Sequence, residues 1–251
     1  MSVLFKAIFF NTIKMRSVWL YWVLGLMPFI VAIAMSINSS FLQISGETGT
    51  LSGLEFFSMI YGVLHNMLFP TIVLAFIISK LFYDELNSGL IFMYKDINKY
   101  QILLSKFFSL LCIQLIYILI LFLSSVIIYF TFISNYEFSS GHLMPIDKYM
   151  AATIVPTLTL YFIEVLTINF SILFSLHFST GITIFGVIFF ILFTTLAPML
   201  DKAKYIVPNG YDEQISSIGA GNVLLLSLVV FLIYYILTTI YIFYRHNNIE
   251  Y

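Results

Sequence analysis

Charged side chains are scarce in this chain of 251 residues. Asp, Glu, Lys and Arg together make up 9 % of the sequence, whereas a soluble globular domain carries about 25 %. Apolar residues reach 61 %, and the mean hydropathy is +1.02. So few Lys and Arg residues exclude a basic surface that binds nucleic acid. The composition predicts an all-α integral membrane protein, with one transmembrane domain over residues 1–251 and no separate soluble domain.

Several chemical signatures are also missing. Cys112 is the one cysteine, so the chain can form no internal disulfide and contains no Cys-x-x-Cys metal motif. There is no GxxxxGK[ST] loop for ATP phosphates, no HExxH zinc pair and no GxSxG serine elbow. We therefore expect no catalytic residue and no metal site. We also expect no cleavable signal sequence, because basic and polar residues interrupt the first apolar stretch.

Six apolar runs are long enough to cross a bilayer core, which takes about 20 helical residues. The predicted spans cover residues 18–37, 56–82, 101–133, 148–176, 181–200 and 221–244. Pro70 lies inside the second run, where we expect a tolerated kink. The third run is on the order of 50 Å long as a helix. It exceeds a core of about 30 Å, so we expect it to tilt or to protrude.

Residues 1–17 mix apolar and basic side chains ahead of the first span. Leu4 and Ile8 share one helical face, and Lys6 and Lys14 lie roughly opposite. We predict an interfacial helix along the cytoplasmic leaflet; the alternative is a simple basic flank to the first span. With the N-terminus inside, eight Lys and Arg residues fall on the cytoplasmic side and three outside. This imbalance predicts that both termini are cytoplasmic.

Glu164 is the one acidic residue deep in a predicted span. An ionisable group at mid-bilayer costs about 2.5–3.5 kcal/mol on insertion scales, so it usually faces the bundle interior or a watery cavity. One interpretation is a translocation path with Glu164, Gln114 and Asn169 as polar points along it. The other is a hydrogen-bonded glutamate that ties two helices together through Gln114 or Asn169. The sequence leaves both open.

The most charged stretch, residues 83–100, lies between the second and third predicted spans on the cytoplasmic side. Five consecutive apolar residues, 90–94, stand among its charges. A solvated loop does not need such a run, whereas a short helix that docks on a partner does. We predict a protein-binding or interfacial surface here, with an ordinary solvated loop as the alternative.

This stretch also carries a family resemblance. Glu85-Leu-Asn-Ser-Gly89 resembles the Glu-x-x-x-Gly element that follows the second span in membrane subunits of ABC-2 type (type V) ABC transporters. Residues 92–100 fall where that family has a short coupling helix, and Lys106 takes the place of its Lys near the start of the third span. Ser105 stands where the family often has Gly, and the common proline of the coupling segment is absent. The amphipathic start, six spans and longer last outer loop also resemble the family.

The resemblance implies a permease subunit of an ATP-driven exporter, not an enzyme. ATP hydrolysis, with its ATP and Mg²⁺, would take place on a separate ABC ATPase subunit, and a second permease copy or a related permease would complete a dimer. It also implies short re-entrant helices in residues 201–220. The implied ATPase-coupling interface comprises Asp84, Glu85, Gly89, Tyr94, Lys95, Asp96, Asn98 and Lys99.

In size and character the chain is similar to small permeases of Gram-positive bacteria, such as lantibiotic-immunity and phenol-soluble-modulin exporter permeases. This resemblance implies export of amphipathic or antimicrobial peptides at a bacterial cell membrane. Two other classes stay open: an intramembrane enzyme, and a non-transporting membrane scaffold or sensor subunit. The enzyme hypothesis lacks a second catalytic residue at a depth that matches Glu164.

Overall fold

The computed structural model describes residues 2–37, 48–89 and 97–248, and no β-strand occurs among them. Within this part of the chain, four helices are long and apolar enough to cross a membrane alone. Two bent helix pairs raise the number to six if each pair is one crossing. The fold is therefore that of a multi-pass membrane protein built from helices.

The four long helices begin within two residues of four predicted spans. They are α7 (Lys99–Thr131), α8 (Asp147–Ser175), α9 (Thr180–Leu196) and α11 (Ala220–Asn247). α8 packs against α9 and α11, and α7 packs against the helices that precede it in the chain. Hydropathy locates these helices because their apolar runs are bounded by polar residues at both ends.

The predicted span 18–37 consists of two helices, α2 (Arg16–Leu24) and α3 (Met27–Ser36), with a bend of 46° between them. The break lies against α7: a Cβ atom added at Gly25 would meet the Ile120 side chain at 3.0 Å. The Ser124 hydroxyl of α7 donates a hydrogen bond of 2.6 Å to the Gly25 carbonyl oxygen. α7 thus satisfies a carbonyl next to the break.

The predicted span 56–82 is broken more sharply, into α4 (Gly53–Asn66) and α5 (Phe69–Ser79) with a bend of 63° at the break. Pro70 predicted a kink, but the helix has already ended at Asn66, and Pro70 is the second residue of α5. In the first turn its missing N–H removes no helical hydrogen bond. Leu68 between the helices has φ +60°, a left-handed conformation that few residues other than glycine adopt.

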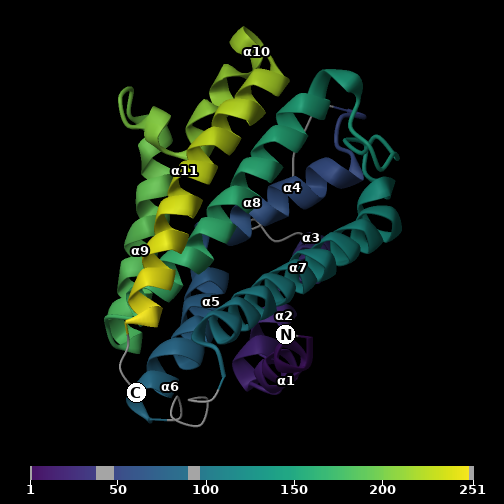
Figure 1. Cartoon of the computed structure of the whole chain (residues 1–251). Helices are drawn as coiled ribbons and strands as arrows, with labels where there is room; N and C mark the ends of the chain where they lie inside the picture. Colours follow the sequence, from purple (N-terminus) through teal and green to yellow (C-terminus); the bar gives the residue numbers. More distant parts are fainter. Residues whose placement is uncertain (1, 38–47, 90–96, 249–251) are drawn as a thin grey trace.

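A π-helical turn, η1 (Lys80–Asp84), and α6 (Glu85–Asn87) continue α5 toward one end of the bundle. Figure 1 shows α1 (Ser2–Ile13), α6 and the last residues of α11 toward this end, and α10 (Ile215–Ile218) at the opposite one. We call the two ends the α6 end and the α10 end. α1 packs along α7; its predicted place at a membrane surface stays a prediction.

At the α10 end, two loops are fastened to each other. Leu51 N–H donates to the Phe138 carbonyl at 2.9 Å, and the Tyr129 hydroxyl donates to the Leu51 carbonyl at 2.8 Å. This end also contains short 3-10 helices: η3 (Ile133–Asn135), η4 (Ala197–Met199), η5 (Lys204–Ile206) and η6 (Pro208–Gln214). The last two lie in the predicted last outer loop. η6 packs on both α8 and α11. Short helices thus occur where the resemblance implied them, while a re-entrant path stays a prediction.

Gly210 marks the tightest approach in this loop. A Cβ atom at this position would lie 1.7 Å from the Lys204 carbonyl oxygen, so η5 and η6 fit together only around a glycine. We predict that Gly210→Ala forces them apart and lowers the thermal unfolding midpoint by several degrees, because overpacking costs about 1–3 kcal/mol. Gly181→Ala is the matched control, since no described atom lies within 4 Å of its added Cβ. Equal midpoints for the two variants in detergent would contradict this account.

Candidate functional site

A polar network joins three helices in the middle of the bundle. Gln114 of α7 lies between two partners: its Nε2 donates to the Glu164 carboxylate of α8, and its Oε1 accepts from the Tyr21 hydroxyl of α2. Tyr21 and Gln114 are buried, and Glu164 is partly buried. One amide therefore satisfies a carboxylate and a hydroxyl that come from different helices.

Two further tyrosines complete this network. The Tyr117 ring of α7 stacks on Tyr21 with 4.4 Å between ring centroids. The Tyr61 hydroxyl of α4 lies beside the Glu164 carboxyl, buried and without a hydrogen bond of good geometry among the described residues. Four helices thus meet at one carboxyl group. None of the three tyrosines was predicted for this site from the sequence; the available signal was their place inside apolar runs, where a hydroxyl needs a partner.

Asn169 belongs to a different contact. Its Nδ2 donates to the Thr238 and Thr239 hydroxyls of α11, each at 3.1 Å. Of the three residues predicted for a translocation path, the structure therefore brings Gln114 and Glu164 together and places Asn169 between α8 and α11. In the Glu164–Gln114 contact, the carboxyl ties two helices as the second interpretation proposed. That geometry is equally compatible with a polar point on a path.

A buried ion pair lies near the α6 end. The Lys106 amine of α7 donates to a Glu85 carboxylate oxygen at 2.7 Å and to the Leu81 carbonyl at 2.6 Å. It also lies 4.9 Å from the centre of the Phe82 ring. The side chains of Lys106 and Glu85 are only 4 % and 19 % exposed. The bond to Leu81 uses a carbonyl of the π-helical turn, so this irregular turn helps to bind the lysine.

The other described residues of the predicted coupling interface also lie near this end. Asp84 ends η1, and Gly89 follows α6 with φ +72°. The Asn98 side chain caps α7 by accepting from the Tyr100 N–H at 2.9 Å, and Lys99 donates to the Asn247 carbonyl of α11 at 3.2 Å. Residues 90–96 lie outside the described residues, and with them Tyr94, Lys95, Asp96 and most of the predicted coupling helix.

Asp212, which the sequence pattern did not single out, is the acid of the predicted outer loop whose pKa is shifted. It lies in η6, and one carboxylate oxygen accepts from the Thr159 hydroxyl of α8 at 2.9 Å. The other oxygen is buried with no hydrogen-bond partner in the described parts of the chain. Burial raises the pKa of Asp212 to about 7, against the smaller lowering effect of Thr159. The sequence signal that could have identified Asp212 was its position as an acid in a loop with proline and glycine between two predicted spans.

Comparison with protein-family models, curated proteins and solved structures finds no match to this chain.

The pH dependence of stability tests the burial of Asp212. The folded protein holds the Asp212 proton more tightly than the unfolded chain does, so folding takes up a proton between pH 4 and 7. The contribution of this group is full below about pH 4 and is lost as the pH rises through about 7. We predict that Asp212→Asn removes this component and gives a higher unfolding midpoint than the natural chain at pH 8. Glu213→Gln, at the exposed neighbouring acid, should leave the pH profile unchanged; a D212N profile parallel to that of the natural chain would contradict the prediction.

A double-mutant cycle tests the ion pair. Lys106→Met leaves the Glu85 carboxylate beside an apolar side chain, and breaking a buried pair in this way typically costs about 3–5 kcal/mol. Glu85→Gln combined with Lys106→Met leaves no charge uncompensated, so its unfolding midpoint should recover most of the loss. Midpoints of both single variants and the double variant give the coupling. Additive losses would show that the two side chains do not interact.

Proposed function

We propose that the chain is the membrane-spanning permease subunit of an ATP-driven ABC exporter. The observation that carries the proposal is the contact between Glu85 and Lys106. These residues belong to the two short elements on which the sequence resemblance rests, and they are 21 positions apart in the chain. Two separate elements of the same resemblance that form one buried pair are expected if both serve the same task.

The pair also offers a route for mechanical coupling. It bonds the α5–η1–α6 segment to α7 immediately before the segment predicted to meet the ATPase. Gln114 lies eight residues further along the same helix, which is about 12 Å at 1.5 Å per residue. A movement imposed on α6 by an ATPase subunit would therefore pass through Lys106 into α7 and reach the Glu164 network.

The proposed assembly has two permeases and two ATPase subunits in a bacterial cell membrane, with both permease termini cytoplasmic. ATP and Mg²⁺ bind the ATPase chains. The proposed substrate is an amphipathic or antimicrobial peptide that is moved out of the cell or the membrane. The Glu164 carboxyl then provides a polar point in an otherwise apolar bundle, where a peptide with polar or cationic groups would find a hydrogen-bond acceptor.

Loss of the ATPase partner is the direct test. We predict that Tyr94→Ala, Asp96→Ala and Lys99→Ala together abolish co-purification of the proposed ATPase subunit, while the amount of inserted permease stays the same. The reason is that an interface helix needs apolar anchors for affinity and charges for orientation.

The matched control is a triple alanine variant at Asp201, Lys202 and Glu213, three exposed charges of the predicted outer loop. It should retain the ATPase fully. If the first variant also retains the ATPase, the coupling assignment is wrong. If no ATPase co-purifies with the unaltered permease, the hypothesis of a non-transporting subunit replaces the proposal. Peptide uptake into inside-out vesicles is the second measurement that distinguishes the two.

A further inference from the structure

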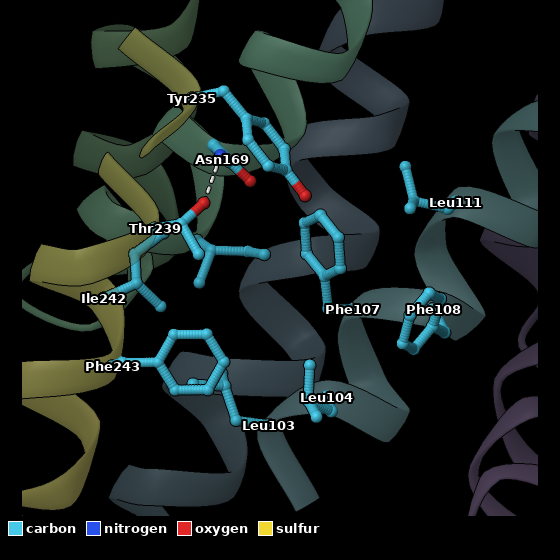
Figure 2. A pocket seen from close by; sticks show the side chains of 11 residues that line it. Leu103, Leu104, Phe107, Phe108, Leu111, Asn169, Tyr235, Thr239, Ile242 and Phe243 are labelled. Atoms are coloured by element: carbon cyan, nitrogen blue, oxygen red, sulfur yellow. Dashed lines mark hydrogen bonds between the residues drawn. The ribbon is translucent and has the colours of Figure 1, made fainter. Parts of the chain in front are cut away.

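A cavity of about 140 Å3 lies between α7, α8 and α11, in the half of these helices nearer the α6 end. Figure 2 shows Leu104 and Phe107 of α7 on one side of it, Phe243 of α11 on the other, and Tyr235 and Asn169 at the top of the view. Apolar cavities of about 150 Å3 lined by Leu, Ile and Phe stay dry and accept benzene. The space therefore suits a ligand the size of one aromatic ring.

The polar wall of this cavity contains an unused acceptor. Asn169 is fully buried, and its Oδ1 has no hydrogen-bond partner among the described residues. The amide orientation is fixed by Thr238, whose hydroxyl donates to the Tyr234 carbonyl at 2.7 Å and so accepts from Asn169 Nδ2. An unpaired buried acceptor destabilises the protein, because it has lost its hydrogen bonds to water and gained none in return. A ligand that brings one donor to this wall recovers that free energy.

The remaining wall favours a ring over a flexible chain. The Phe107 and Tyr235 rings contact each other at an interplanar angle of 59°, with 6.1 Å between their centroids, and together line one side of the cavity. Phe243 stacks on Tyr100 with 4.9 Å between centroids, so its ring is held in place. Aromatic pairs in offset or edge-to-face contact stabilise binding beyond the effect of their buried area. A lipid acyl chain gains neither this contact nor a hydrogen bond to Asn169.

We propose that this cavity is a binding site for a small aromatic molecule with one hydrogen-bond donor, of the phenol class. The ring lies among Leu104, Phe107 and Phe243, and its hydroxyl donates to Asn169 Oδ1. The site is separate from the Glu164 network and from the Glu85–Lys106 pair. It stands whether or not the chain is a transporter subunit.

Fluorine NMR of 4-fluorophenol with the full-length chain in lipid nanodiscs tests the site, and 4-fluorotoluene serves as the probe without a donor. Empty nanodiscs give the partition of each probe into lipid. We expect saturable binding of 4-fluorophenol, about tenfold tighter than that of 4-fluorotoluene, because one hydrogen bond contributes about 0.5–1.5 kcal/mol. This comparison uses only the unaltered chain, so its result does not depend on whether a variant folds.

Variants then locate the binding. Leu104→Trp fills the cavity and should abolish saturable binding of both probes. Asn169→Leu should weaken 4-fluorophenol about tenfold and leave 4-fluorotoluene unchanged. Ser171→Ala, on the same helix but bonded to its own helix at Thr167, is the control and should change nothing. Partition equal to that of empty nanodiscs for both probes overturns the proposal. Equal affinity for the two probes overturns it as well and assigns the cavity to an apolar group such as an acyl chain.

Discussion

Every polar group inside a bilayer must find its partner within the protein, because hydrocarbon offers none. The Lys106 amine finds the Glu85 carboxylate and the Leu81 carbonyl, and the Glu164 carboxyl finds the Gln114 amide. In each case the partners come from different helices. Lipid tails are as apolar as Leu, so hydrophobic burial does not select which helices meet. The polar contacts make that selection, and the apolar side chains then pack around them.

Two stretches of the chain connect the Glu164 network with the Glu85–Lys106 pair. α7 carries both Lys106 and Gln114 and runs without interruption between them. The other connection is broken: α4 brings Tyr61 to Glu164, α5 leads to Glu85, and Leu68 stands between the two helices in a left-handed conformation. Such a conformation in a non-glycine residue costs about 1–3 kcal/mol and persists only where surrounding contacts impose it. The connection through α7 is thus one continuous helix, whereas the connection through α4 and α5 contains a strained residue at the break.

The sequence predicted the long helices well because hydropathy reports contact with lipid, and that contact is local to each run. It did not predict the break at Gly25, and near Leu68 it predicted a kink at Pro70 and not a break ahead of it. Pro70 did signal an irregularity, but proline is tolerated in a first turn, so the helix ended before it. The break at Gly25 is in contact with α7, whose Ser124 bonds the Gly25 carbonyl, and such a contact is not local in the sequence.

The candidate site was predictable to a similar extent. An acid and an amide inside apolar runs stand out, so Glu164 and Gln114 were found, whereas Lys106 was found through the family resemblance. Tyr21 and Tyr61 were not, because a tyrosine also suits a membrane interface and only the fold reveals its depth. Glu164 pairs with Gln114 and not with Asn169, and this choice follows from the way α7 and α8 cross. That crossing is a property of the whole bundle.

Asn169 and Asp212 show two different ways in which this fold treats a buried oxygen without a partner. Asp212 lies in a loop outside the spans and can take up a proton, which is why burial raises its pKa to about 7. Asn169 cannot titrate, and turning its side chain would break the bonds to Thr238 and Thr239. Its oxygen is satisfied only if a donor reaches it from outside the chain. A cavity of about 140 Å3 adjoins Asn169. Binding a ligand with a donor there is therefore more favourable than leaving the Asn169 oxygen without a hydrogen bond.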